Sequence, residues 1–257
     1  MDAWPYPLWF AHRGAGKLAP ENTLAAFRLG ASHGQTAFEC DVKLSTDGVP
    51  FLLHDNTLER TTSGAGIAGE RLWSELSQLD AGGWHGPAYA GESIPALAAV
   101  ARWCLANGHL LDLEIKPTPG AETRTGQVVG TEVARLWAGA ETTPLLSSFR
   151  PEALAGARET APQLRRALLV DGLWPGWFEV ATELGCVAVI SNQRCMDAAL
   201  VARLHGARLR ALVYTVNDAA RAQALVELGV DGIVTDAVDR FSPAGGIGTS
   251  PAGGIGR

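Results

Sequence analysis

The 257-residue sequence has no apolar run approaching the roughly 18 residues that cross a bilayer, so no membrane-spanning helix and no stable membrane insertion are expected. Its N-terminus lacks a basic segment followed by a long apolar one, which predicts no signal peptide and a cytoplasmic location. The four cysteines form no CxxC pair, and this favours a reducing compartment over a disulfide scaffold. Acidic residues outnumber basic ones, 27 to 21, and a net charge of −6 is not typical of a nucleic-acid-binding protein.

The chain does have enough apolar residues, 47% of the total, to exclude intrinsic disorder. Short apolar runs alternate with amphipathic helical stretches. The eight predicted strands are Leu8–Ala11, Ala37–Val42, His109–Ile115, Leu145–Ser148, Arg166–Val170, Val187–Ile190, Arg210–Tyr214 and Gly232–Thr235. This alternation indicates parallel βα units, and eight of them favour an α/β fold, the (β/α)8 TIM barrel. A doubly wound sheet is the alternative, but His12-Arg13-Gly14 after the first strand is not its Gly-rich phosphate loop.

Two segments interrupt this pattern. A strand-like run, Pro50–His54, is followed by a Gly-rich polar stretch, and we predict a small insertion of about residues 55–93 after the second barrel strand. The C-terminus contains SPAGGIG twice, at Ser242–Gly248 and Ser250–Gly256. The sequence therefore predicts a barrel domain over residues 1–241 and a disordered low-complexity tail of Gly, Pro and Ser over residues 242–257.

Three carboxylates occur at positions where parallel strands would bring them together. Glu39 and Asp41 are two residues apart on one strand, so both side chains point to the same face, and Glu114 lies on the next barrel strand. Burying several carboxylates without compensation costs several kcal/mol per ion, roughly, so a partner is required. A hard divalent cation, Mg²⁺ or Ca²⁺, would compensate them. The alternative is a set of salt bridges to Arg13, Lys43 and Lys116.

Asp47-Gly48, between two extended runs, predicts a hairpin with a two-residue turn. In that register Asp41 faces His54, so His54 would lie beside the carboxylates. His12 follows the neighbouring first strand. Two histidines beside an anionic pocket suit acid–base catalysis near neutral pH.

Two basic residues, Arg13 and Lys116, are predicted at the same mouth. Fixed cations beside a metal site suit an oxyanion such as phosphate. The other histidines, which have no carboxylate in their sequence surroundings, are interpreted as structural: His33, His85, His109 and His205.

An ordered set of motifs along nearly the whole chain resembles the glycerophosphodiester phosphodiesterase family, of the small bacterial cytoplasmic type. The motifs are His12-Arg13-Gly14, Pro20-Glu21-Asn22-Thr23, Glu39-x-Asp41, His54-Asp55, Thr57-Leu58-x-Arg60-Thr61-Thr62, Leu79-Asp80-Ala81-Gly82, Ile94-Pro95-x-Leu97, Glu114-Ile115-Lys116, Ser148-Phe149, Thr215-Val216-Asn217 and Gly229–Asp236.

The resemblance implies a TIM barrel that hydrolyses glycerophosphodiesters to glycerol 3-phosphate and an alcohol with a divalent cation. It places the catalytic pair on His12 and His54. By the same resemblance the metal carboxylates are Glu39, Asp41 and Glu114, and the phosphate-binding residues are Arg13 and Lys116.

Local sequence adds one further expectation: Asn22 is predicted to cap the helix that starts at Thr23. The alternative interpretation of this motif is that the carboxylate of Glu21 braces the mouth. Two other functions stay open. One is a phosphodiesterase for lysophospholipids, served by an apolar patch on the insertion (Leu72, Trp73, Leu76, Leu79, Trp84). The other is a barrel that only binds anionic ligands, against which the two histidines argue. The sequence leaves the headgroup, the metal and the oligomeric state open.

Overall fold

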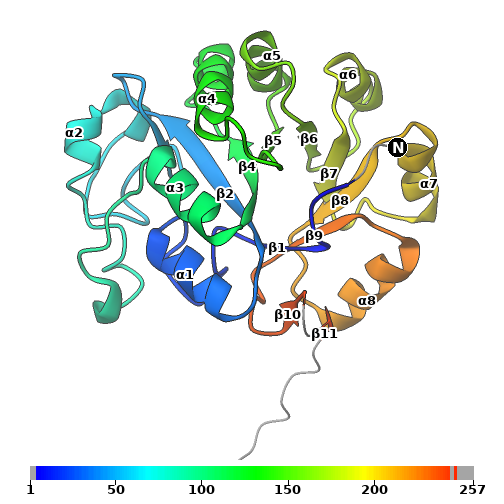
Figure 1. Ribbon diagram of the computed structural model, residues 1–257, viewed down its shortest axis with the longest axis horizontal. Helices are drawn as coiled ribbons and strands as arrows, with labels where there is room; N and C mark the ends of the chain where they lie inside the picture. The colour runs from blue at the N-terminus through cyan, green and yellow to red at the C-terminus, as the bar shows by residue number, and fades with distance from the viewer. Residues whose placement is uncertain (1–3, 244–245, 248–257) are drawn as a thin grey trace, which may run out of the picture.

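The computed structural model describes residues 4–243 and 246–247 and has a closed barrel of eight parallel strands with helices outside it (Figure 1). The barrel strands are β1 Trp9–Ala11, β2 Ala37–Leu44, β4 Leu110–Ile115, β5 Leu145–Ser148, β6 Arg166–Val170, β7 Ala188–Asn192, β8 Arg210–Tyr214 and β9 Gly232–Thr235. Pairing of β1 with both β9 and β2 closes the ring. The predicted (β/α)8 TIM barrel is confirmed, and the eight predicted strands correspond to the barrel strands within one or two residues at each end.

Helices surround the ring and cover its outer side. They are α1 Leu24–Ser32, α3 Leu97–Asn107, α4 Glu122–Leu136, α5 Pro151–Thr160, α6 Trp177–Glu183, α7 Ala198–Gly206 and α8 Ala219–Leu228. Their apolar faces pack on outward-pointing strand residues, while the barrel interior holds a separate apolar cluster that includes Phe10, Leu145 and Leu212. Among the described residues, no helix has both the length and the apolarity to cross a membrane.

Strand β2 shows how this layering positions polar groups. Its outward residues Phe38, Cys40 and Val42 belong to the cluster between barrel and helices. Side chains alternate along a strand, so Glu39 and Asp41 share the barrel side. Apolar packing on one face therefore fixes the direction of two carboxylates on the other.

The hairpin after β2 differs from the prediction by one residue. β3, Pro50–Leu52, pairs antiparallel with β2 through Val42–Leu52 and Leu44–Pro50. Gly48 has φ 82° and donates its N–H to the Ser45 carbonyl, so the loop has three residues rather than two. The predicted pairing of Asp41 with His54 is wrong, because an extra left-handed residue shifts the register.

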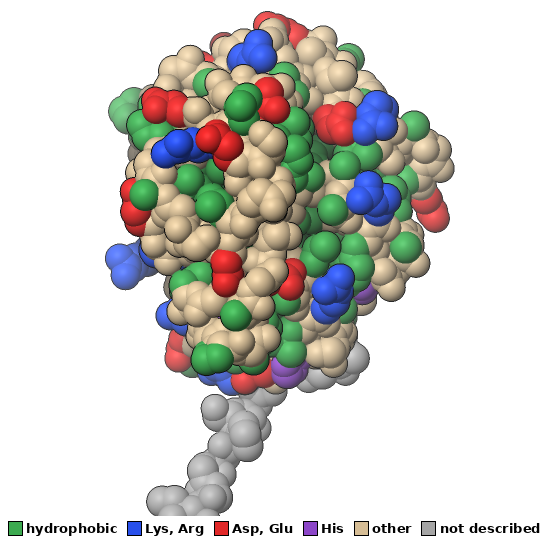
Figure 2. Space-filling model, turned by 90° about the vertical axis from the view of Figure 1, so that its left-hand side faces the viewer, with side chains coloured by type: hydrophobic (Ala, Val, Ile, Leu, Met, Phe, Trp, Pro, Cys, Tyr) green, Lys and Arg blue, Asp and Glu red, His purple; other side chains and the backbone are tan. Residues whose placement is uncertain are grey.

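The insertion after β3 lies outside the ring, beside α1 on the left of Figure 1. It contains η1 Ala68–Glu70, α2 Trp73–Leu76 and η2 Pro87–Tyr89. Leu76 is buried in the insertion's own small core, and the half-buried Trp73 and Leu79 pack against that core. Leu72 and Trp84 remain exposed, so the predicted apolar patch is only in part interior. On the side shown in Figure 2, acidic, basic and apolar side chains are interspersed.

The predicted disordered tail, residues 242–257, lies mostly outside the described residues. Its described part includes Ser242, which ends β10, Phe241–Ser242, and β11, Gly246–Ile247. These two short strands pair antiparallel, so the first repeat contains regular structure.

Candidate active site

All seven predicted site residues lie at the end of the barrel where the parallel strands terminate. They are His12 and Arg13 after β1, Glu39 and Asp41 on β2, His54 after β3, Glu114 on β4 and Lys116 directly after it. In a TIM barrel this is the end at which active sites are built.

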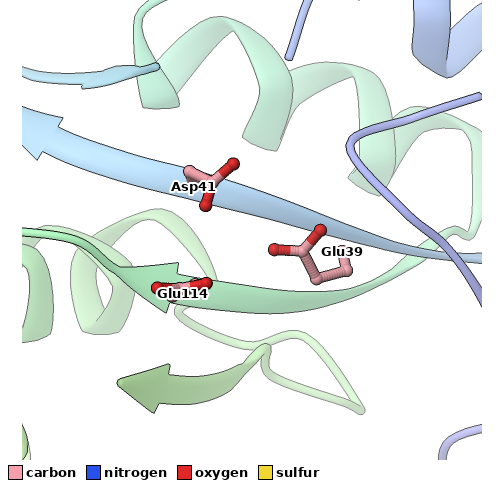
Figure 3. Close-up of side chains that lie close together, drawn as sticks. All are labelled: Glu39, Asp41 and Glu114. Atoms are coloured by element: carbon pink, nitrogen blue, oxygen red, sulfur yellow. The ribbon is translucent and has the colours of Figure 1, made fainter. Parts of the chain in front are cut away.

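The three carboxylates converge on one point. Asp41 and Glu114 are register partners in the parallel β2–β4 pair, and Glu39 precedes Asp41 on the same face. One oxygen from each of the three side chains lies within 4.8 Å of the others, and all three residues are buried. Figure 3 shows the carboxylates of the two strands turned toward a common space.

Crowding changes the protonation of these groups. Burial, together with the charges of Asp41 and Glu114, raises the pKa of Glu39 well above its usual value. Burial and Asp41 raise the pKa of Glu114 to about 7. Burial is the main cause of both shifts, and the neighbouring carboxylates add to it, so the described cations compensate the cluster only in part. An oxygen-rich, under-compensated cluster fits a hard divalent cation.

The alternative interpretation, salt bridges, is realised in part. Nζ of Lys116 lies 3.3 Å from Asp41 and 3.2 Å from Glu114, and Nε of Arg13 lies 3.4 Å from Asp41. Burial acts to raise the pKa of Asp41, but these cations, His54 and a hydrogen bond from Asn22 lower it below its usual range. Lys43 does not pair with the carboxylates, because its Nζ donates to Asn56 and to the Lys116 carbonyl.

Asn22 has a different role from the predicted helix cap. Thr23 is the N-cap of α1 and accepts from the Ala26 N–H. Asn22 adopts φ 59° and turns its side chain to Asp41, donating from Nδ2 at 2.8 Å and accepting the Asp41 N–H at 3.0 Å. Asn tolerates this left-handed backbone better than most residues, so it can fix the orientation of one carboxylate of the cluster.

His12 is oriented by a residue from the far end of the chain. Its Nδ1 donates to Oδ1 of Asp236 at 2.6 Å, and its Nε2 lies 3.8 Å from Oε2 of Glu39. Asn217 donates to the second oxygen of Asp236 at 2.8 Å. In the sequence, Asn217 and Asp236 stand out as members of the family motifs, and no pattern links them to His12.

His54 is oriented by its neighbour Asp55, which accepts from Nδ1 at 2.6 Å. Although the predicted register is wrong, His54 still interacts electrostatically with Asp41, because the preceding residue, Leu53, donates its N–H to the Asp41 carbonyl at 3.1 Å. Burial lowers the pKa of His54, as do the charges of Arg13 and Lys116, while Asp41 and Asp55 oppose the shift.

Arg13, the predicted phosphate ligand, has φ 51° and donates from Nη1 to Glu21 at 2.8 Å. Glu21 therefore does brace the mouth, as the alternative interpretation of its motif expects. Beside the site lies a cavity of about 510 Å³, whose lining includes His54, Glu114, Lys116 and Phe149. Its size is in the range of small-molecule sites.

The remaining histidines lie outside this cluster. The prediction that His205 lacks carboxylate company is wrong, because its Nε2 lies 2.7 Å from Asp231, just before β9 at the opposite end of the barrel. His109 stacks on Trp103 with ring centroids 4.7 Å apart. These contacts are consistent with structural roles.

Comparison with known proteins gives a consistent result. The model of the glycerophosphoryl diester phosphodiesterase family matches residues 12–240. The chain is 33% identical over 235 residues to YhdW of Bacillus subtilis, whose name assigns it to the same activity, covering 89% of this chain and 94% of that protein. A glycerophosphodiester phosphodiesterase of Caldanaerobacter subterraneus subsp. tengcongensis is 31% identical over 234 residues, 89% of this chain and 93% of that one. A phosphodiesterase of Oleispira antarctica, solved with the product sn-glycerol-3-phosphate, superposes with a TM-score of 0.84 at 34% identity, covering 91% of this chain and 94% of that chain.

Proposed function

Since this chain belongs to the glycerophosphoryl diester phosphodiesterase family, and is thus a phosphoric diester hydrolase, we propose that it converts glycerophosphodiesters to glycerol 3-phosphate and an alcohol using one divalent cation and His12/His54 acid–base catalysis. The observation that carries the proposal is the meeting of three carboxylates, two histidines and two cations at one barrel mouth. A protein that only binds anions has no need of two histidines, each oriented by its own carboxylate.

The cation would be held by Glu39, Asp41 and Glu114, because these are the clustered oxygen donors of the mouth. When bound, Mg²⁺ or Ca²⁺ would polarise substrate oxygens and acidify the glycerol hydroxyl beside the ester. The positive charges of Arg13 and Lys116 adjoin the same carboxylates and would stabilise the phosphoryl oxygens as charge develops.

His54 suits the role of general base. Its Nδ1 donates to Asp55, which leaves Nε2 free to accept a proton, and burial with the charges of Arg13 and Lys116 lowers its pKa. His12 takes the complementary role of general acid. Its Nδ1 donates to Asp236, so the transferable proton is on Nε2.

In the first step His54 removes the proton of the glycerol hydroxyl adjacent to the phosphoester, and that oxygen attacks phosphorus. The ester bond to the alcohol breaks, and His12 protonates the leaving oxygen. The product of this step is a cyclic glycerol phosphate. Water then opens the ring with the histidine roles reversed, and glycerol 3-phosphate is released. Holding the hydroxyl close to phosphorus is worth several kcal/mol, roughly, through proximity.

A substrate lacking the glycerol hydroxyl next to the ester tests the internal nucleophile. We expect glycerophosphocholine to be hydrolysed and its deoxy analogue to be inert, and we expect excess chelator to abolish turnover until Mg²⁺ or Ca²⁺ is restored. Equal turnover of the two diesters would show that water attacks phosphorus directly. Full activity in chelator would overturn the metal assignment.

A further inference from the structure

Arg60, in the insertion, joins two carboxylates of the barrel mouth. Its Nε and Nη2 donate to the two oxygens of Asp55 at 2.5 and 3.0 Å. Its Nη1 and Nη2 donate to the two oxygens of Glu21, both at 2.8 Å. One planar guanidinium thus makes two bidentate contacts, a geometry that Lys cannot reproduce.

Each of these carboxylates also holds a residue assigned to the reaction. Asp55 accepts from Nδ1 of His54 at 2.6 Å, and Glu21 accepts from Nη1 of Arg13 at 2.8 Å. A continuous chain of contacts therefore runs from the proposed base, through Asp55, Arg60 and Glu21, to the proposed phosphate ligand. Asp55 and Glu21 are brought to the same guanidinium from segments 34 residues apart in the sequence.

Stability alone gives a poor account of this arrangement. The Arg60 side chain is 44% exposed, and exposed ion pairs contribute only about 0–1 kcal/mol to folding. Its position matters more. If Arg60 is removed, two like-charged carboxylates lose their shared counter-ion, and each becomes free to turn away with the residue that it orients.

We propose that Arg60 is a positioning residue. Through Asp55 and Glu21 it fixes the positions of His54 and Arg13 relative to one another, so that the proposed base and the proposed phosphate ligand contact the same substrate molecule. This inference rests on the proposed function. It also gives the insertion a task in the reaction, because a residue of the insertion ties the β3 exit to the loop between β1 and α1.

The test compares Arg60→Gln and Arg60→Lys with a matched control, Arg71→Gln. Arg71 belongs to the same insertion and is exposed, and its guanidinium contacts the Ala65 carbonyl rather than the mouth. Steady-state kinetics on glycerophosphocholine and thermal melting are measured for each. A misplacement of about 1 Å can cost about 100-fold.

We expect Arg60→Gln to lower kcat about 10- to 100-fold, because His54 is loosened, and to raise KM several-fold, because Arg13 is loosened. Arg60→Lys should recover only part of the lost activity, since it restores the positive charge without the bidentate geometry of the guanidinium. Arg71→Gln should match the wild type, and the melting temperatures of all variants should agree within a few degrees.

A double-mutant cycle separates positioning from a purely structural effect. Asp55→Asn cuts the same link, so adding Arg60→Gln to it should cost far less kcat than in the wild-type background. Wild-type kcat and KM in Arg60→Gln, or a loss fully additive with Asp55→Asn, would overturn the positioning role while the wild type stays active. An inactive wild type would instead refute the proposed function, and this inference with it.

Discussion

The contact between Asn22 and Asp41 allows a quantitative prediction. Asn22 is 2% exposed and Asp41 1% exposed, and two hydrogen bonds join them. Asn22→Ala removes a donor to a charged oxygen, worth about 1.5–3 kcal/mol, and leaves the Asp41 N–H without this acceptor, which costs about 1–3 kcal/mol if it stays buried and unpaired. An alanine at φ 59° adds about 1–2 kcal/mol of backbone strain.

Because these contributions overlap, we expect Asn22→Ala to lower the free energy of unfolding by about 3–5 kcal/mol. Asn22→Gly is the matched variant. It loses the same hydrogen bonds but accepts the positive φ, so its loss should be about 1 kcal/mol smaller. Both variants should bind the divalent cation roughly 10- to 100-fold more weakly, since Asp41 loses a group that orients it.

Urea unfolding in chelator measures the stability of each variant, and calorimetric titration with Mg²⁺ measures the affinity. Running the unfolding without metal separates the hydrogen bonds from any effect of weakened binding. The reasoning is refuted if Asn22→Ala unfolds within about 1 kcal/mol of the wild type, smaller than one such hydrogen bond. A glycine variant less stable than the alanine variant would refute the strain argument alone.

Three further predictions concern protonation, leaving-group chemistry and the tail. In chelator, we expect the free energy of unfolding to be greatest near pH 4.5 and to fall toward pH 7 and above. The pKa of Glu39 is raised, and that of Glu114 is raised to about 7, so the folded chain keeps protons that the unfolded chain releases near the usual glutamate pKa of about 4.5. Saturating Mg²⁺ should flatten this fall, and a flat profile without metal in urea unfolding across pH would contradict it. Asp236→Asn should slow an alkyl diester about 10²–10⁴-fold but a p-nitrophenyl diester far less, since a good leaving group needs no general acid; equal losses in the two assays would remove His12 from that role. Truncation after Ser242 removes β11, which pairs with β10 and lies beside α8, so we expect the melting temperature to fall by no more than about 2–4 °C, the equivalent of about 1 kcal/mol at this size, with turnover unchanged. A larger drop would show that the tail stabilises the barrel by more than these contacts.

The sequence predicts the barrel well because each strand shows its burial directly. In β2, apolar residues on both sides of Glu39 and Asp41 indicate a buried strand, and the two-residue spacing places both carboxylates on one face. The same alternation on β4 supplies Glu114. For these residues local periodicity is sufficient to predict their place in the site, because residues at equivalent positions along the strands of a closed barrel lie at the same mouth.

Two of the failures come from the backbone conformation of a single residue. At the hairpin, Asp-Gly is compatible with a two-residue or a three-residue loop, and only the left-handed Gly48 of the folded chain selects the longer one. At the start of α1, Asn22 and Thr23 are both good caps, and the choice depends on Asp41, a long-range partner. The contacts of Arg60 were missed for a different reason: its guanidinium reaches between two loops that are distant in the sequence, and no periodic pattern encodes such a contact.

The hydrogen bond from His12 to Asp236 spans 224 residues, nearly the whole described chain. During synthesis, His12 leaves the ribosome early. Asp236, which orients it, is made near the end and reaches His12 only after β9 pairs with β1. Such a distant pairing forms late, because the entropy lost in closing a long loop is offset only once the contact has formed. A nascent or truncated barrel can therefore bring together its carboxylates from β2 and β4 while His12, the proposed general acid, still lacks the partner that orients it. We expect hydrolysis to switch on only at closure, so that turnover itself reports complete folding of the chain.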